Sequence, residues 1–284
     1  MSNNNTEWEW EISSRQKWFD IDWKGIFDNW ELILGFVKRD ILSTQHQTVL
    51  GWFWIILQPL LTTLVYLVIF GNIIKISTDG SPPLLFYLSG NMLWGYFSDC
   101  LFGGMFTFKT NAHIFGKIYF PRLLIPISNI ITQTFRLSIN LIFFVAILLY
   151  FHLDGQVASF AYDLWKIPFL LIGIAAYALG WGLIISVLTA KYKDLENLVH
   201  FILRLYMFAS PIFYPSSIVA DDFKLIYSLN PLAPLIESFR AVYNHQTVLW
   251  GLPLFWITTG SIVLVLSVGL ILFSKRERKI MDFI

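Results

Sequence analysis

The sequence predicts an all-α polytopic membrane protein with six transmembrane helices. Hydrophobic residues form 56% of the 284-residue chain and charged residues only 14%, and the mean hydropathy is +0.61. A soluble protein carries roughly 25% charged residues. The chain instead holds six apolar stretches, each near the roughly 20 residues that a helix needs to cross a bilayer. The net charge of +1 provides no field that would attract nucleic acid.

The first 48 residues are expected to form a cytosolic segment. Residues 1–7 lack the basic and apolar regions of a cleavable signal peptide. Between Trp23 and Val37, apolar residues recur at helical spacing and charged residues fall on the other side, which is typical of an amphipathic helix lying in the membrane interface. A helix packed on a soluble core is the alternative. The residues assigned to this interface helix are Trp23, Phe27, Trp30, Lys38 and Arg39.

Residues 49–284 are expected to form one transmembrane domain. The expected spans are about 49–74, 84–106, 123–151, 167–188, 198–213 and 252–273. Fourteen Lys and Arg residues fall in the segments on one side of these spans, and four fall on the other side. By the positive-inside rule, both termini are therefore expected in the cytosol.

The connection after the second span, residues 111–126, is basic, apolar and able to form a helix. Pro121 removes a backbone donor and directs Phe120 away from helical conformation, so a helix must end before it. The topology places this connection in the cytosol. It is either a tight loop whose charges fix the orientation or a docking element for a partner protein.

Residues 214–251 are expected on the outer side of the membrane. Pro215, Pro231 and Pro234 divide them into two short amphipathic pieces, near 217–227 and 235–248. Each piece is too short to cross a bilayer and too apolar for a free loop. We therefore expect two short re-entrant helices that form a gate at the rim of a pathway. Two helices lying flat on the surface are the alternative.

The sequence carries no catalytic or metal-binding pattern. The five histidines never take up metal-ligand spacing. The one Gly-Lys pair, Gly116-Lys117, is followed by isoleucine and lacks the upstream glycine of a P-loop. We expect a protein that is not an enzyme, with no catalytic residue, metal or cofactor of its own. If ATP drives its work, a separate subunit must bind the ATP and Mg²⁺.

Charged residues inside the expected spans are costly there, and they usually face a pathway or a partner. Asp99 and Arg136 are expected to form either an ion pair between helices or part of such a pathway. Arg204 could attract a phosphate-bearing substrate, or it could reach water and nearby carbonyl groups. Aromatic residues in or beside the first and fifth spans could stack on sugar rings, although packing is the commoner role: Tyr66, Phe70, Tyr206, Phe213 and Tyr214.

Five motifs follow one another along the chain. They are Lys38-Arg39-Asp40 leading to Gln58-Pro59, the stretch Asn111 to Pro126 with Phe120-Pro121-Arg122, Lys191-Tyr192-Lys193-Asp194-Leu195, Ser210-Pro211-Ile212-Phe213-Tyr214-Pro215, and Asn230-Pro231 followed by Arg240. In this order and spacing, over about residues 25–284, the chain resembles the permeases of type-2 ABC exporters. The similar branch exports O-antigen, capsular polysaccharide and teichoic acid. One departure is that residues 44–47 read Thr-Gln-His-Gln, where the family often has Arg-Tyr-Lys/Arg. That removes basic charge at the cytosolic entrance.

The resemblance implies a permease that homodimerises and pairs with two copies of an ABC ATPase. The substrate would be an undecaprenyl-diphosphate-linked glycan, moved across the bacterial inner membrane through a channel lined by the first and fifth spans. A coupling helix at about 109–120 would contact the ATPase through Asn111, Ile114, Phe115, Lys117 and Tyr119, with a second contact at Lys191 and Asp194. The channel and gate candidates are Tyr66, Phe70, Arg204, Tyr206, Ser210, Phe213, Tyr214 and Arg240.

Two alternatives to an O-antigen exporter remain open at this stage. The first is a type-2 permease for teichoic acid, capsule, a drug or a small lipid. The second, from a different class, is a polytopic membrane transferase, which would require clustered catalytic His or Asp residues near one membrane face.

Overall fold

The computed structural model describes residues 23–43, 51–115, 120–157, 164–220, 222–223, 227, 229–244 and 252–280. All regular secondary structure in these residues is helical, which confirms the all-α prediction. The elements in chain order are α1 (Trp23–Asp28), α2 (Trp30–Ser43), α3 (Phe53–Tyr66), the π-helix η1 (Leu67–Ile73), α4 (Pro83–Met105), α5 (Thr107–Phe115), α6 (Leu124–Leu153), α7 (Lys166–Thr189), α8 (Leu195–Phe208), the 3₁₀ helix η3 (Ser216–Ile218), α10 (Leu232–Asn244) and α11 (Leu252–Ile280).

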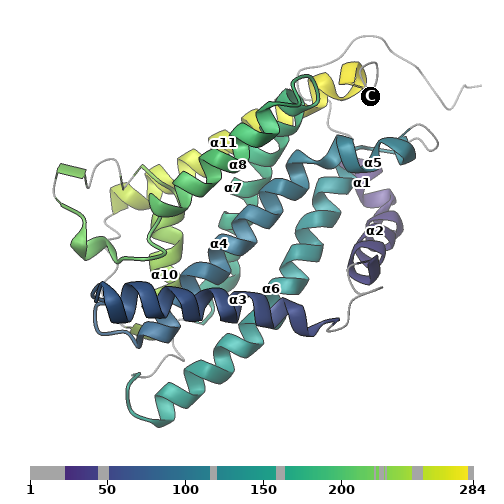
Figure 1. Ribbon diagram of the computed structural model, residues 1–284. Coiled ribbons are helices and arrows are strands. Elements are labelled where there is room, and N and C mark those ends of the chain that lie inside the picture. Colours follow the sequence, from purple (N-terminus) through teal and green to yellow (C-terminus); the bar gives the residue numbers. More distant parts are fainter. Residues whose placement is uncertain are drawn as a thin grey trace, which may run out of the picture.

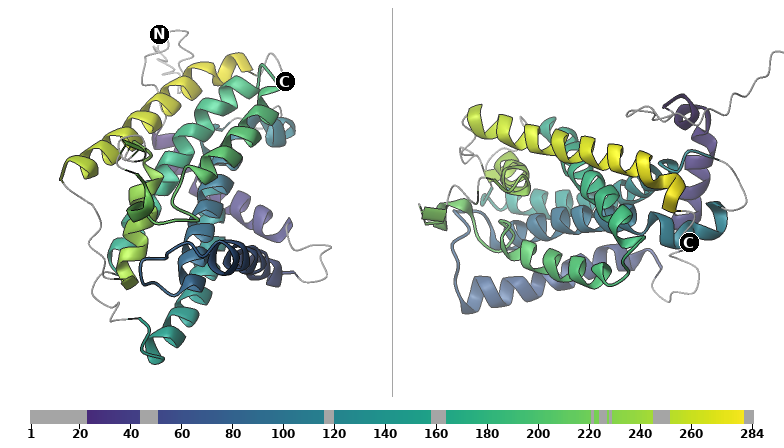
Figure 2. Two further views of the ribbon diagram at one scale, coloured as in Figure 1. Left: turned by 60° about the vertical axis from the view of Figure 1, so that its left-hand side comes forward. Right: turned by 90° about the horizontal axis from the view of Figure 1, so that it is seen from above.

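Helix α4 lies at the centre of the bundle. It packs against α6 on one side and α7 on another, and α11 lies along α7 (Figures 1 and 2). Most α4 side chains are buried; Leu85, Leu93 and Phe97 are almost fully enclosed. Helix α3 crosses α4 and α6 from outside (Figure 1). One end of the bundle, with α5 and the C-terminal part of α11, is called the α5 end. The other end, with α10 and the loop between η1 and α4, is called the α10 end.

Within the described residues, four helical segments are long and apolar enough to cross a membrane. They are Phe53–Ile73, Leu124–Leu153, Lys166–Thr189 and Leu254–Arg276. These four correspond to the first, third, fourth and sixth expected spans, so a multi-pass membrane protein is confirmed. Helix α4 matches the bounds of the expected second span but is more polar. Helix α8 has 14 residues, fewer than the expected fifth span. The six-span topology therefore stays a prediction.

Two glycines of α7 allow its backbone to approach two neighbouring helices. A Cβ atom at Gly182 would lie 2.8 Å from the carbonyl oxygen of Leu101 in α4, and one at Gly180 would lie 2.7 Å from the backbone nitrogen of Leu266 in α11. Small residues at such crossings bring helices close enough for dense van der Waals packing, which drives helix association in lipid. The three helices α4, α7 and α11 are thus joined backbone to backbone.

The expected interface helix is divided into α1 and α2 at Asn29, whose side-chain amide donates to the carbonyl oxygen of Gly25 at 2.7 Å. The apolar residues of this segment form two stripes rather than one. Ile33, Phe36 and Val37 are buried where α2 packs on α6. The other stripe remains outside, with Phe27 74% and Trp30 50% exposed. Lys38 and Arg39 are exposed, α1 begins at Trp23 with its side chain outside the described part, and the expected boundary at residue 48 lies in an undescribed stretch.

Candidate functional site: the coupling end and the aromatic wall

Helix α5, the expected coupling helix, is fixed to the bundle by its inner face. Thr107 and Phe108 are buried, and the Thr107 hydroxyl donates to the carbonyl oxygen of Gly103 at 3.1 Å. The Phe108 ring stacks on Phe273 of α11 with centroids 5.0 Å apart. The described helix, Thr107–Phe115, begins about two residues before the expected start, and residues 116–119, including Lys117 and Tyr119, lie outside the described part.

The expected coupling residues mainly contact the protein itself. Asn111 is buried and accepts a hydrogen bond from Nη1 of Arg39 in α2 at 3.3 Å. Phe115 is half-buried, and its ring stacks on Phe120 at a centroid distance of 5.6 Å. Ile114 is half-buried as well. The outward surface of α5 is instead formed by Lys109, Thr110 and His113, which are exposed.

The second expected contact lies at the same end of the molecule. Lys191 and Asp194 are exposed in the turn between α7 and α8. An ion pair of 2.6 Å between Lys109 Nζ and Glu196 Oε2 joins α5 to the first turn of α8. The structure therefore brings together two segments that the sequence assigned to one role from motifs about 80 residues apart.

Three channel candidates meet in one aromatic cluster. The ring of Phe213 lies 4.9 Å from Tyr66 at the end of α3 and 4.6 Å from Phe70 of η1, centroid to centroid. Phe208, the last residue of α8, lies 5.2 Å from Phe213 on another side. Edge-on and tilted ring pairs of this kind are favourable aromatic geometries. We call Tyr66, Phe70, Phe208 and Phe213 the aromatic wall; it connects α3 to the chain that leaves α8.

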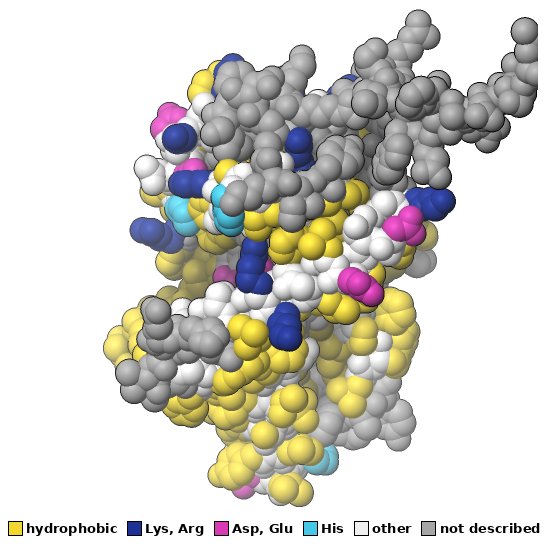
Figure 3. Space-filling view, turned by 90° about the vertical axis from the view of Figure 1, so that its right-hand side faces the viewer, with side chains coloured by type: hydrophobic (Ala, Val, Ile, Leu, Met, Phe, Trp, Pro, Cys, Tyr) yellow, Lys and Arg dark blue, Asp and Glu magenta, His cyan; other side chains and the backbone are white. Residues whose placement is uncertain are grey.

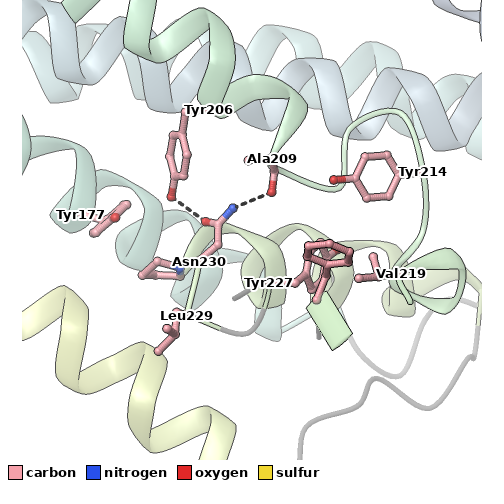
Figure 4. A pocket seen from close by; sticks show the side chains of 10 residues that line it. Tyr177, Tyr206, Ala209, Tyr214, Val219, Tyr227, Leu229 and Asn230 are labelled. Atoms are coloured by element: carbon pink, nitrogen blue, oxygen red, sulfur yellow. Dashed lines mark hydrogen bonds between the residues drawn. The ribbon is translucent and has the colours of Figure 1, made fainter. Parts of the chain in front are cut away.

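Beside this wall, a cavity of about 410 Å³ opens between Tyr206 and the segment that joins α8 to α10 (Figure 4). The Tyr206 hydroxyl donates to Oδ1 of Asn230, and Nδ2 of Asn230 donates to the carbonyl oxygen of Ala209 and to Oγ of Ser210, both at 3.1 Å. Tyr214, also in the cavity wall, donates to the carbonyl oxygen of Phe208 at 2.9 Å. The motifs around Ser210 and Asn230 thus form one hydrogen-bonded unit.

Tyr227, in the segment that joins α8 to α10, lines the same cavity. Its hydroxyl donates to Oε1 of Glu237 at 3.1 Å, and Glu237 also accepts from the backbone nitrogen of Ser216 at 2.9 Å. Burial and the neighbouring Glu237 carboxylate raise the pKa of the Tyr227 phenol above its usual range, so the hydroxyl stays protonated and keeps donating. This bond holds the piece around Tyr227 against α10. The first of the two expected re-entrant helices lies partly outside the described residues.

Arg240 of α10 is a structural anchor at the α10 end. It is 5% exposed, and its guanidinium carbon lies 3.5 Å from the ring centroid of Phe86. Nη2 donates to the carbonyl oxygens of Phe86 and Ile212 at 3.0 and 3.3 Å, and Nε donates to Oγ of Ser89 at 3.4 Å. The anchor therefore links α10, α4 and the Ser210–Pro215 turn.

Ser89, a partner of this anchor, and the nearby Asp79–Ser217 pair were not expected from the sequence. Ser89 also shares a hydrogen bond with the Tyr243 hydroxyl at 3.1 Å, and both side chains are buried. On the outside, the Asp79 carboxylate accepts from the Ser217 hydroxyl at 2.7 and 2.9 Å. Residue spacing could not predict these contacts, because each pair joins segments more than 130 residues apart. The only local hint was that Ser89 is a polar residue inside an apolar stretch.

The charged residues of the expected spans separate into two groups. Arg204 is exposed on α8. Asp99 and Arg136 line one cavity at the α5 end and attract each other across it. In the described ranges, no cluster of His, Cys, Asp and Glu has the arrangement of a metal site.

Comparison with known proteins identifies the family of the chain and several relatives. The ABC-2 type transporter family matches residues 31–244. The chain is 28% identical over 254 residues to an O-antigen export system permease protein, RfbA of Klebsiella pneumoniae, covering 89% of this chain and 95% of that protein. It is 26% identical over 256 residues to the RfbA permease of Myxococcus xanthus, covering 87% and 93%. It is 25% identical over 243 residues to the polysialic acid transport protein KpsM of Escherichia coli, covering 84% and 91%. Because the family match extends over most of its length, this chain belongs to the ABC-2 type transporter family.

Proposed function

We propose that this chain is the membrane subunit of an ATP-driven exporter that carries a lipid-linked polysaccharide of the O-antigen type across the bacterial inner membrane. The observation that carries the proposal is the similarity to O-antigen export permeases, which extends over nearly the whole of both chains. It includes the segments that form α5, the aromatic wall and the Arg240 anchor. The glycan would be attached to undecaprenyl diphosphate.

The proposed topology has six spans with both termini in the cytosol. Helix α4 serves as the second span although it is more polar than the others, because its neighbours α6 and α7 shield it from lipid. Helix α8 serves as the fifth span and continues through the Ser210–Pro215 turn. The α5 end faces the cytosol, in accord with the excess of Lys and Arg there.

Two copies of the chain would enclose the channel between them. Helices α3 and α8 leave large apolar side chains exposed on the outside of the bundle, including Leu64 and Val65 on α3 and Phe201 and Leu205 on α8. Apolar exposure on two neighbouring helices suits a second copy, with lipid covering the remainder. The aromatic wall then lies beside the path, where ring faces can contact the apolar faces of sugars.

Two copies of a separate ATPase would supply ATP binding and Mg²⁺, since this sequence has no P-loop. The exposed residues His113 of α5 and Lys191 and Asp194 of the α7–α8 turn are the described surface for that contact. Ile114, Phe115, Lys117 and Tyr119 complete the proposed coupling helix. The inner side of α5, fixed by Phe108, would pass the movement of the ATPase to α11.

The test is reconstitution of the permease with its ATPase in lipid nanodiscs and proteoliposomes. We expect ATP hydrolysis to rise several-fold when the lipid-linked glycan is added, and glycan to accumulate in the vesicle lumen only with ATP. A permease that forms the complex but moves a drug or free phospholipid and ignores the glycan contradicts the proposal. The similarity to KpsM favours capsular polysaccharide as a second candidate cargo, and the same assay with capsular glycan distinguishes it.

A further inference from the structure

A second cavity, at the α5 end, is separate from the aromatic wall and shares Thr110 and His113 with the exposed surface of α5. Its volume is about 560 Å³, within the roughly 300–1,000 Å³ typical of small-molecule sites. Side chains from α2, α4, α5 and α6 line it. Figure 3 shows basic, acidic and histidine side chains gathered around hollows in the upper part of this face, above a mostly hydrophobic lower part. We call it the vestibule.

The polar groups of the vestibule balance one another in charge. Arg39 pairs with Asp40 at 2.8 Å, and Arg136 attracts Asp99. Planar amides add both donors and acceptors, with Gln133 of α6 among them. A site for a phosphate would present surplus cations. The balanced set instead suits a neutral ligand that both donates and accepts many hydrogen bonds.

Two further features match a sugar ring. The rings of Phe102 and Phe106 line the vestibule and are nearly parallel, 17° apart in plane with centroids 6.1 Å apart. One face of Phe102 is stacked on His200 of α8 at 4.4 Å, so only the remaining ring surface can face a ligand. Aromatic groups of this kind contact the C–H faces of a pyranose while neighbouring amides and carboxylates pair with its hydroxyl groups. A polyhydroxylated ring is therefore the ligand class that uses both the flat apolar side and the polar side of the vestibule.

One vestibule residue is held in place and has an unused acceptor. The Asn129 amide fills the position that a side chain at Gly103 would occupy, because a Cβ there would lie 1.9 Å from Asn129 Oδ1. Within the described part of the chain, this buried Oδ1 atom has no hydrogen-bond partner. A buried acceptor without a partner is destabilising, because it has lost its hydrogen bonds to water. A ligand hydroxyl reaching it would remove that destabilisation.

We propose that the vestibule binds a sugar residue of the cargo glycan before it is moved, an inference that rests on the proposed function. The floor of the vestibule is α5 itself, through Thr110, Asn111 and His113. A sugar bound there touches the same helix that we place at the ATPase contact, and His113 belongs to both surfaces. Occupancy by cargo is thus sensed directly at α5, and the hydrolysis rate reports it.

The experiment uses the assembled permease–ATPase complex in nanodiscs. Two probes are titrated: the lipid-linked glycan, and undecaprenyl diphosphate without sugar. Gln133→Leu removes one polar group of the vestibule and Asn129→Leu removes another, both without changing its charge, so that one variant remains informative if the other fails to assemble. Gln156→Leu repeats the Gln-to-Leu substitution in the loop after α6, outside the vestibule, and serves as the matched control.

We expect about tenfold weaker binding of the glycan lipid by each vestibule variant, with undecaprenyl diphosphate affected by less than about twofold, because one lost hydrogen bond is worth roughly a factor of ten. Glycan-stimulated hydrolysis should shift to the same higher concentrations. Equal losses for both probes would show a phosphate site and overturn the inference, as would unchanged binding of both. If the unmodified complex fails to bind the glycan lipid at all, the proposed function itself is wrong.

Discussion

Replacing Arg240 with methionine removes the guanidinium that joins α10 to α4 and to the turn after α8. The two carbonyl oxygens that it contacts, on Phe86 and Ile212, lie at 3.0 and 3.3 Å. Hydrogen bonds from a charged donor contribute about 1.5–3 kcal/mol each. Nη1 is buried without a partner in the described structure, which offsets about 1–3 kcal/mol of that gain. The expected loss in free energy of unfolding is therefore about 3 kcal/mol.

The measurement is thermal unfolding of the purified permease in detergent, followed by tryptophan fluorescence. At about 2–4 °C per kcal/mol for larger domains, Arg240→Met should lower Tm by roughly 6–12 °C. Arg240→Lys keeps the charge but lacks the planar fork, so its loss should be intermediate. Arg204→Met makes the same substitution on the exposed side of α8 and should change Tm by less than about 2 °C. If Arg240→Met unfolds within about 1 °C of the unmodified protein, the anchor contributes no net stability and the reasoning fails.

Three other substitutions test separate parts of the structure. Gly180→Ala places a methyl group 2.7 Å from the Leu266 backbone and should cost about 1–3 kcal/mol in thermal unfolding, whereas Gly260→Ala, with nothing within 4 Å, should cost nothing; equal effects would contradict the close helix contact. Phe115→Asp should leave membrane insertion intact but abolish export and lower glycan-stimulated hydrolysis, while Phe115→Leu retains both; normal export by the aspartate variant would exclude the coupling role. Arg204→Met should reduce export several-fold at unchanged stability if that cation guides the phosphate of the cargo, and unchanged export refutes that role.

The apolar spans could be predicted because length and hydropathy are local properties of the sequence. The bounds expected for the second span, about 84–106, agree with Pro83–Met105 within a residue or two. The expected coupling helix begins about two residues earlier than expected, because Phe106 forms a turn between two helices that the apolar pattern does not interrupt. Periodicity also assigned the apolar residues of the N-terminal helix to one face. It could not separate those buried against α6 from those left outside, since both groups are equally hydrophobic.

The composition of the candidate site could be predicted better than its contacts. Tyr66, Phe70 and Phe213 were named from their residue type and depth, but their meeting depends on how α3 crosses the bundle. The Arg240 anchor pairs with Ser89 across 151 positions of sequence, a separation that no local pattern encodes. Asp99 and Arg136 of the vestibule were named as charges inside spans, but the cavity itself was missed because its residues come from four helices.

The glycine contacts of α7 divide the molecule into mechanically unequal parts. Helices α4, α7 and α11 touch through backbone, so sliding one past another would require overlapping main-chain atoms. Helix α3 is held to the end of α8 by rings, which can rotate and slip at little cost. The helices α4, α7 and α11 are thus rigid relative to one another, whereas the aromatic wall can rearrange. A polymer of uneven width can advance by displacing the side chains of the wall, while the three helices transmit force from one end of the protein to the other.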